Sequence, residues 1–132
     1  MIIKRLKLKY MNELSKEQQG NEANTLLPAV LLDDEGYPSD DYLKFIRDFK
    51  ENTMPIMDFI QMICENWNHG SMGYHLSRKY KGKYKFELHT LGWSGNEEII
   101  REITNNIYLT HFYMKYYQWR TGGHYYFEVP VR

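Results

Sequence analysis

The spacing of the hydrophobic residues changes at Gly70, and this change limits the possible folds more than any other feature of the chain. Before Gly70, apolar residues recur every three or four positions, as they do over residues 42–49, which predicts amphipathic helices. After Gly70, apolar and polar residues alternate over 83–91, which is typical of a strand with one buried face. The sequence therefore predicts helices first and a sheet after them.

Two helices are expected before the change of spacing. Ser39 is a good N-cap for a helix that runs to about Glu51. Thr53 is predicted to cap the second helix, with Pro55 in its first turn. The run at 68–70, Asn-His-Gly, is expected to end that helix.

The second half of the chain predicts two hairpins joined by a short helix. Lys81-Gly82 reads as the first hairpin turn, and Thr121-Gly122-Gly123 as the second. The intervening helix begins at Ser94, which with Glu97 has the S-x-x-E spacing of a capping box. The strands are expected near 72–80, 83–91, 107–120 and 124–130. The predicted fold class is α+β: two N-terminal helices, then β-β-α-β-β forming one antiparallel sheet of about four strands, with the helices on one side.

The 132 residues are expected to form a single domain, 1–132, of which 1–28 are partly irregular. The only cysteine, Cys64, excludes an intramolecular disulfide and fits a reducing compartment. The N-terminal run has no signal-peptide pattern, and no apolar run approaches the roughly 18 residues of a membrane helix. We expect a soluble protein in the cytoplasm, or in the host cell cytoplasm if a phage encodes it.

Charge is distributed unevenly although the net charge is zero. Residues 1–70 hold 8 basic and 12 acidic side chains, whereas residues 71–132 hold 9 and 5. The second half also contains 14 of the 21 aromatic residues and four of the five histidines. This composition favours an anionic or planar partner, but it also fits an aromatic-rich sheet with solvated lysines.

A candidate ligand site lies where the two predicted hairpins approach the start of the short helix. The amides of that helix end could hold an anion, and a glycine there would permit close approach. An indole could stack on a ring, and arginine and histidine could bind phosphate or carboxylate. The candidate residues are His89, Trp93, Ser94, Gly95, Asn96, Arg120 and His124. The alternative is a capped helix start and a satisfied turn, with Trp93 in the core.

Other kinds of site are weaker candidates. Ser94, His124 and Glu97 supply the residue types of a hydrolase triad, but the surrounding sequence is not a nucleophile elbow. The histidines are scattered, so we expect no metal site, and no cofactor motif is present. The basic run 78–85, RKYKGKYK, could contact a nucleic-acid backbone, although lysines at a hairpin tip also serve solubility.

Two motifs, LHTLGWSGNEEI at 88–99 and WRTGGHYYFEV at 119–129, resemble those of a group of small uncharacterised proteins found in bacteriophages and prophages. That family's motifs are similar to L-H-T-G-G-W-S-G-N-E-E-I-I and R-G-G-H-Y. The helical run YLKFIRDF after GYPS is also similar, so the resemblance covers residues 29–129. Leu91 stands where the family motif has its first glycine, and Thr121 is inserted after Arg120. The resemblance implies a phage or mobile-element setting.

The leading functional hypothesis is a small binding protein of phage or prophage type, whose ligand is a nucleotide, another anionic molecule or a host protein. Nucleic acid is a weaker candidate, and the oligomeric state is open. An enzyme acting on a phosphate-bearing or acyl ligand is the second hypothesis, although we favour a protein without catalysis. The third is a protein–protein adaptor that uses exposed aromatic residues of the last hairpin.

Overall fold

A four-stranded antiparallel sheet organises the computed structural model, which describes residues 27–50, 52–77 and 80–130. The strand order is β1-β2-β4-β3. The strands are β1 (Tyr74–Leu76), β2 (Lys83–His89), β3 (Lys115–Arg120) and β4 (His124–Pro130). The expectation that residues 1–28 are partly irregular falls almost wholly outside the described ranges.

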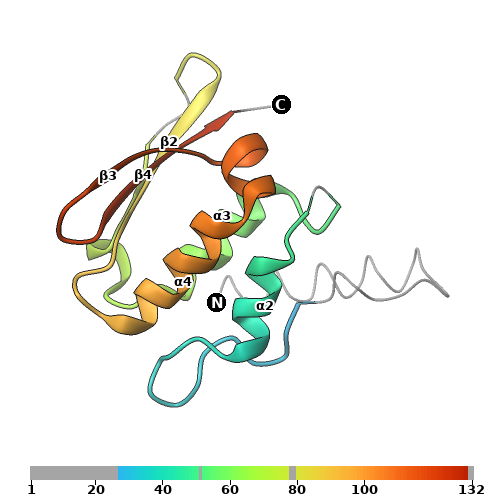
Figure 1. Ribbon diagram of the computed structural model, residues 1–132, viewed down its shortest axis with the longest axis vertical. Helices are drawn as coiled ribbons and strands as arrows, with labels where there is room; N and C mark the ends of the chain where they lie inside the picture. Colours follow the sequence, from blue (N-terminus) through green and yellow to red (C-terminus); the bar gives the residue numbers. More distant parts are fainter. Residues whose placement is uncertain (1–26, 51, 78–79, 131–132) are drawn as a thin grey trace, which may run out of the picture.

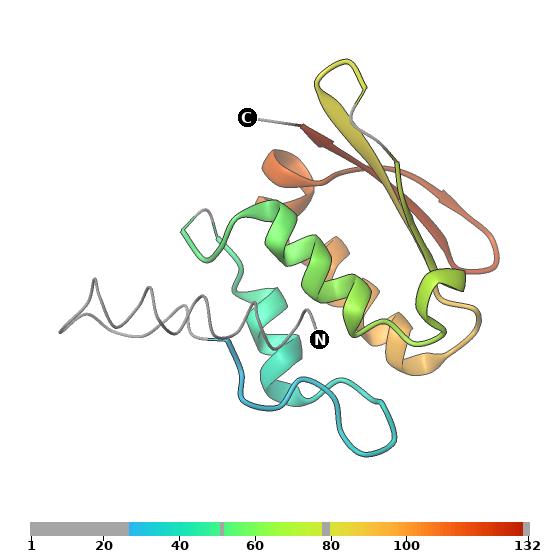
Figure 2. The same ribbon diagram turned by 180° about the vertical axis from the view of Figure 1, so that it is seen from behind.

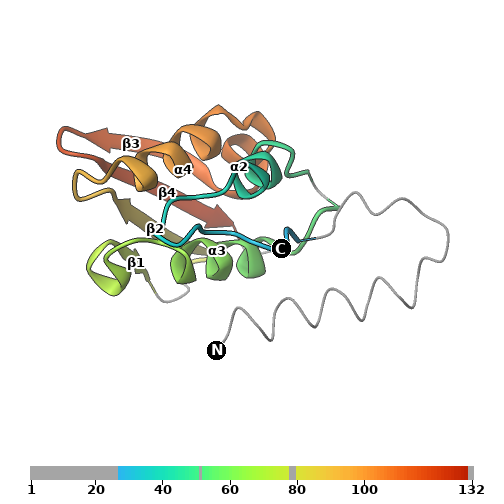
Figure 3. The same cartoon turned by 90° about the horizontal axis from the view of Figure 1, so that it is seen from below.

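Three helices lie on one side of the sheet, as Figures 1 and 2 show. They are α2 (Asp40–Arg47), α3 (Ile56–Glu65) and α4 (Ser94–Asn105). Figure 3 shows α2 and α4 next to each other, and residues of these two helices are in contact. The predicted α+β class, the single antiparallel sheet and the helices on one side are confirmed.

The core lies between this helical layer and one face of the sheet. In β2, Phe86 and Leu88 are fully buried, and in β4, Phe127 and Val129 are at most 1% exposed. The helices contribute the buried residues Tyr42, Ile46, Phe59, Ile60, Ile63, Ile99 and Ile103. The predicted alternation in β2 is therefore confirmed. The opposite face of the sheet, turned away from the helices, is called the outer face below.

The helix starts agree only partly with the sequence. Ser39 caps α2 as predicted, because its Oγ accepts a hydrogen bond of 3.0 Å from the amide of Tyr42. The predicted cap at Thr53 is wrong. Its hydroxyl accepts the amide of Lys50 at 2.9 Å within the preceding loop, and α3 starts after Pro55 instead.

The first hairpin turns at Lys81-Gly82 as predicted. Both residues have positive φ, 54° and 79°, which is the requirement of a type I′ turn. The strand before the turn starts later than the predicted residue 72, because Gly70–Met72 forms a 3₁₀ turn, η1, and β1 is Tyr74–Leu76.

The predicted strand over 107–120 is wrong in its first half. Residues 107–113 are helical and include the π-helical turn η2 (Leu109–Tyr113), and β3 begins only at Lys115. The apolar run was ambiguous between helix and strand, and the preceding residue, Asn106, decides it. Its Oδ1 accepts the amide of Leu109 at 3.1 Å, which starts the helical turn.

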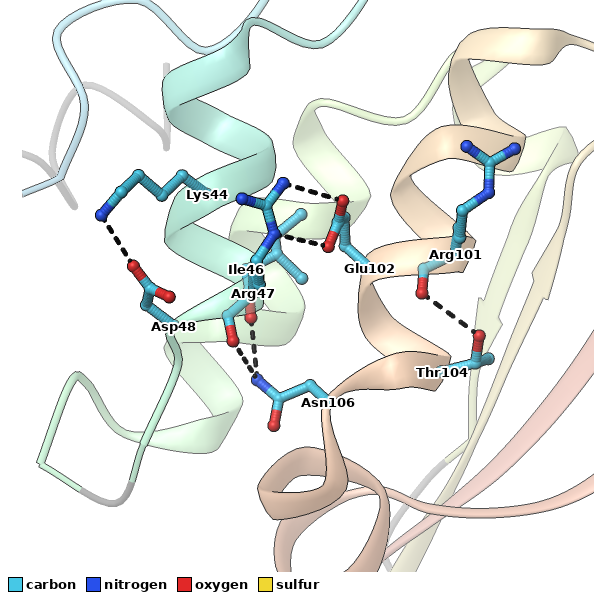
Figure 4. Close-up of polar contacts among 8 residues, drawn as sticks. All are labelled: Lys44, Ile46, Arg47, Asp48, Arg101, Glu102, Thr104 and Asn106. Carbon is cyan, nitrogen blue, oxygen red and sulfur yellow. Dashed lines mark hydrogen bonds and ion pairs between the residues drawn. The ribbon is translucent and has the colours of Figure 1, made fainter.

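Asn106 also connects this turn to the end of α2. Its buried Nδ2 donates to the carbonyls of Ile46, Arg47 and Phe49 at 2.8, 3.3 and 3.1 Å. Figure 4 shows the bonds to Ile46 and Arg47 beside the two hydrogen bonds that join Arg47 to Glu102, each 3.1 Å. The end of α2 and the end of α4 are therefore fixed to each other by polar contacts.

Candidate functional site

The seven candidate residues separate into two groups on different layers of the molecule. His89, Arg120 and His124 stand at the ends of strands on the outer face. The other four, Trp93, Ser94, Gly95 and Asn96, form the start of α4 in the helical layer. The two groups meet near a hydrogen bond of 2.9 Å from the amide of Thr90 to the carbonyl of Gly123.

The two histidines of the first group are in direct contact. His89 ends β2 and His124 begins β4, and the antiparallel register places them opposite each other. Their Nδ1 atoms are 2.8 Å apart, which is a hydrogen bond in which one ring donates and the other accepts. The Nε2 of His89 lies 3.3 Å from Oε1 of Glu87. This contact favours the tautomer of His89 that carries its proton on Nε2, in which Nδ1 is the acceptor of the pair.

Two tyrosines extend this group along the outer face. The guanidinium of Arg120 lies over the ring of Tyr126, 5.7 Å from its centroid. The same ring contacts His89 edge to face, at 6.1 Å, and Tyr117 at 6.4 Å. We call His89, Tyr117, Arg120, His124 and Tyr126 the outer-face cluster. None of its members is buried.

Sequence reasoning missed Tyr117, Tyr126 and Glu87. Tyr126 and Glu87 were predictable from the sequence, because each lies two positions from a candidate histidine on the same strand and so shares its face. Tyr117 was not, because a bulge between Tyr116 and Gln118 shifts the register of β3 and changes which side chains face outward. Its pKa is raised, first by desolvation and then by the carboxylates of Glu128 and Glu87, so the phenol stays protonated.

The start of α4 is closed rather than open. Trp93 packs against Tyr37, with ring centroids 4.7 Å apart. Its indole also lies over Gly95, so that a Cβ at this glycine would collide with the ring. The glycine was expected to let a ligand approach the helix amides. Instead it admits the indole of its own neighbour.

Asn96 is fully buried and has structural partners on both sides. Its Oδ1 accepts the amide of Asn68 at 3.1 Å, and its Nδ2 donates to the carbonyls of Asn68 and Thr90 at 3.2 and 3.4 Å. This side chain therefore joins the end of α3 to the loop before α4, and its amide is used within the fold.

The predicted capping box at Ser94 and Glu97 is not formed. The N-cap is Trp93, whose carbonyl accepts the amide of Glu97 at 3.2 Å, and no side chain caps this helix end. Ser94 is the first helical residue and is exposed. The amide of Glu97 was predicted to donate to the hydroxyl of Ser94, but it donates to the backbone carbonyl of Trp93.

Ser94→Ala is expected to change the free energy of unfolding by less than about 0.5 kcal/mol, because an exposed hydroxyl without a capping bond is lost. Ser39→Ala is the matched comparison, since Ser39 does cap a helix and should cost about 1 kcal/mol. Urea denaturation of both variants checks this difference. Equal losses in the two variants would show that Ser94 caps α4 in solution.

The described residues do not assemble the hydrolase triad. His124 pairs with His89 on the sheet, whereas Ser94 begins a helix, and no hydrogen bond joins these two residues within the described part of the chain.

Burial raises the pKa of Cys64 to about 12, so its thiol is a poor nucleophile at neutral pH.

Comparison with known proteins found no matching family model, no matching curated protein and no matching solved structure. In the ranges that the structure describes, no helix has the length and apolar character needed to cross a membrane. The functional proposal therefore depends on the geometry of the outer-face cluster.

Proposed function

We propose that this chain is a small, non-catalytic binding protein of bacteriophage or prophage type, located in the host cytoplasm. Its ligand is an anion that carries a planar ring, as a nucleotide does, and it binds on the outer face of the sheet. The observation that carries this proposal is the position of Arg120 over Tyr126, beside the two paired histidines.

The electrostatics of the outer face support an anionic ligand. The carboxylate of Glu87 lies 3.3 Å from Nε2 of His89, and Glu128 forms an ion pair of 3.3 Å with Lys83. Arg120 is exposed and has no ion-pair partner among the described residues. Its fork of N–H donors is therefore free to grip a phosphate or carboxylate with two parallel bonds.

The aromatic members of the cluster support a planar group next to that anion. Tyr117 in β3 is 41% exposed and contacts Tyr126 on the neighbouring strand β4. Exposed rings in such a row offer stacking surfaces, which contribute about 1–3 kcal/mol for each base in nucleic-acid complexes. The start of α4 does not compete as a site, because Trp93 and Asn96 already occupy it.

Arg120→Ala is expected to weaken binding of the preferred nucleotide roughly tenfold or more, because a hydrogen bond to a charged group contributes about 1.5–3 kcal/mol. Nucleotides and cyclic nucleotides are first screened by thermal shift on the wild type, and the best ligand is then measured by calorimetry. Arg101→Ala is the matched control, since Arg101 is an exposed arginine on α4.

Two outcomes would contradict the proposal: no nucleotide shifts the wild type, or the two arginine variants lose the same affinity. Chromatography of the ligand after incubation separates binding from catalysis. A binding protein returns the nucleotide unchanged, whereas the alternative enzyme converts it.

A protein–protein adaptor is the second candidate, favoured by the edge position of β3. This strand exposes Tyr117 and Trp119, which are 41% and 54% accessible, and aromatic residues are enriched at interfaces. If the nucleotide panel gives no binding, this strand is the surface on which a host protein would dock.

A further inference from the structure

The paired histidines of the outer-face cluster bring two ring nitrogens within 2.8 Å of each other, a feature that nucleotide binding does not require. We infer that His89 and His124 form a binding site for a divalent transition-metal ion of the group that prefers imidazole, namely Cu²⁺, Ni²⁺ or Zn²⁺. Both Nδ1 atoms are the ligands, and the remaining coordination positions are open to water or an added anion. This inference is independent of the proposed nucleotide binding.

The distance between the two nitrogens fits one shared metal ion. Bonds of about 2.0–2.1 Å place two imidazole nitrogens roughly 2.9 Å apart at a right angle and roughly 3.3 Å apart at a tetrahedral angle. The Nδ1 atoms of His89 and His124 are already 2.8 Å apart. The separation of the nitrogens therefore needs to change by only a few tenths of an ångström, but both rings must also turn, so that the nitrogen lone pairs leave the line of the hydrogen bond and point at one metal position.

Glu87 prepares His89 as a ligand. Its carboxylate oxygen lies 3.3 Å from Nε2 of His89, which favours the tautomer with the proton on Nε2 and a free lone pair on Nδ1. A carboxylate that holds the remote nitrogen of a ligating histidine is a common support of metal sites. For His124, binding requires only that the proton on Nδ1 move through solvent to Nε2, so the pair stays neutral and no net proton is released.

The backbone under both rings is held in place. His89 and His124 face each other across the register of β2 and β4. The carbonyl of His89 accepts Nε1 of Trp67 at 3.0 Å, and the next residue, Thr90, donates its amide to Gly123. Ligands on paired strands with fixed neighbours form a more precise site than ligands on loops.

Only two protein ligands are present in this part of the fold, and no group of three His, Cys, Asp or Glu side chains suited to a metal occurs among the described residues. The site is therefore an open one, in which solvent or a small anion completes the coordination. Arg120 stands opposite His124 in β3, so an anion on the metal would lie near a positive charge.

The test is calorimetric titration of the full chain with Ni²⁺, Cu²⁺ and Zn²⁺ at neutral pH, without nucleotide. The wild type is expected to bind one ion at this site, and His89→Gln and His124→Gln are each expected to weaken it at least tenfold. Glu87→Gln should weaken it roughly tenfold, as loss of an outer-shell partner does. His111→Gln, an exposed histidine in η2, is the control and should retain full affinity.

Two results would overturn the site: no binding by the wild type, or the same affinity in the double variant of His89 and His124. Electron paramagnetic resonance of the Cu²⁺-loaded wild type provides a readout that does not depend on folding of the variants. It should show coupling to the nitrogens of two imidazoles, and a spectrum with fewer would also overturn the inference. Because nucleotide is absent throughout, failure here leaves the proposed binding function untouched.

Discussion

Replacing Asn106 with alanine is expected to lower the free energy of unfolding by roughly 3 kcal/mol, one of the two largest effects that we expect from a single substitution in this chain. Asn106 is 7% exposed, and its side chain forms hydrogen bonds to the end of α2 and to the helical turn that follows α4. Its amide nitrogen donates to three carbonyls at the end of α2, and its oxygen accepts the amide of Leu109. Alanine would remove this partner from the buried carbonyl of Phe49 and the buried amide of Leu109, whereas the carbonyl of Ile46 would keep the amide of Phe49. Each buried group left unpaired costs about 1–3 kcal/mol.

Asn105→Ala is the matched control for this prediction. Asn105 is the adjacent asparagine and the last residue of α4, but it is exposed. Its replacement should change stability by no more than about 0.5 kcal/mol. Urea denaturation followed by circular dichroism measures both variants. If they differed by less than about 1 kcal/mol, Asn106 would not connect α2 to η2 as described.

Gly123→Ala is expected to cost a similar amount, roughly 3 kcal/mol, for two separate reasons. Gly123 has a φ of +83°, in the region where a side chain is strained. A Cβ there would also collide with Oγ1 of Thr90, a fully buried residue. The turn can close over Thr90 only because position 123 has no side chain.

Two further variants separate strain from collision. Gly122→Ala has comparable strain, with a φ of +100°, but its Cβ would approach only the ring of His124, at 3.2 Å. It should cost about 1–2 kcal/mol. Thr90→Ala combined with Gly123→Ala should recover part of the loss, because it removes the colliding hydroxyl. Thermal or urea melts of this double-mutant cycle give the coupling, and strictly additive losses would contradict the collision.

Most of the fold follows from local patterns in the sequence. The spacing of apolar residues over 42–49 and the alternation in β2 each identify one buried face, because burial of that face is what makes the element stable. Capping at Ser39 and the turn at Lys81-Gly82 were also predictable, since both depend on residues within a few positions of each other.

The candidate site was predictable only in part. The sequence placed His89 and His124 at strand ends, but their pairing does not follow from the hairpin turns, because β2 and β4 belong to different hairpins and pair only in the assembled sheet. The bulge that orients Tyr117 and the packing of Trp93 over Gly95 do not follow, because each depends on contacts with another element or with a neighbour's rotamer. The sequence therefore identified the right region. The predicted site, however, combined residues of the exposed outer face with residues at the closed start of α4.

What the sequence determined by itself was the class of each element with a clear period and the order β-β-α-β-β. Only the tertiary structure decided the local conformation where the sequence signals fitted two alternatives equally well. Residues 107–113 could have formed a strand, but the side chain of Asn106 bonds both to the end of α2 and to Leu109, and these bonds make the segment helical. At α4, the carbonyl of Trp93 takes the amide that Ser94 was predicted to cap. In the first case the partners of Asn106 include buried carbonyls of Ile46 and Phe49, which must be satisfied and whose position is fixed by packing rather than by the local sequence.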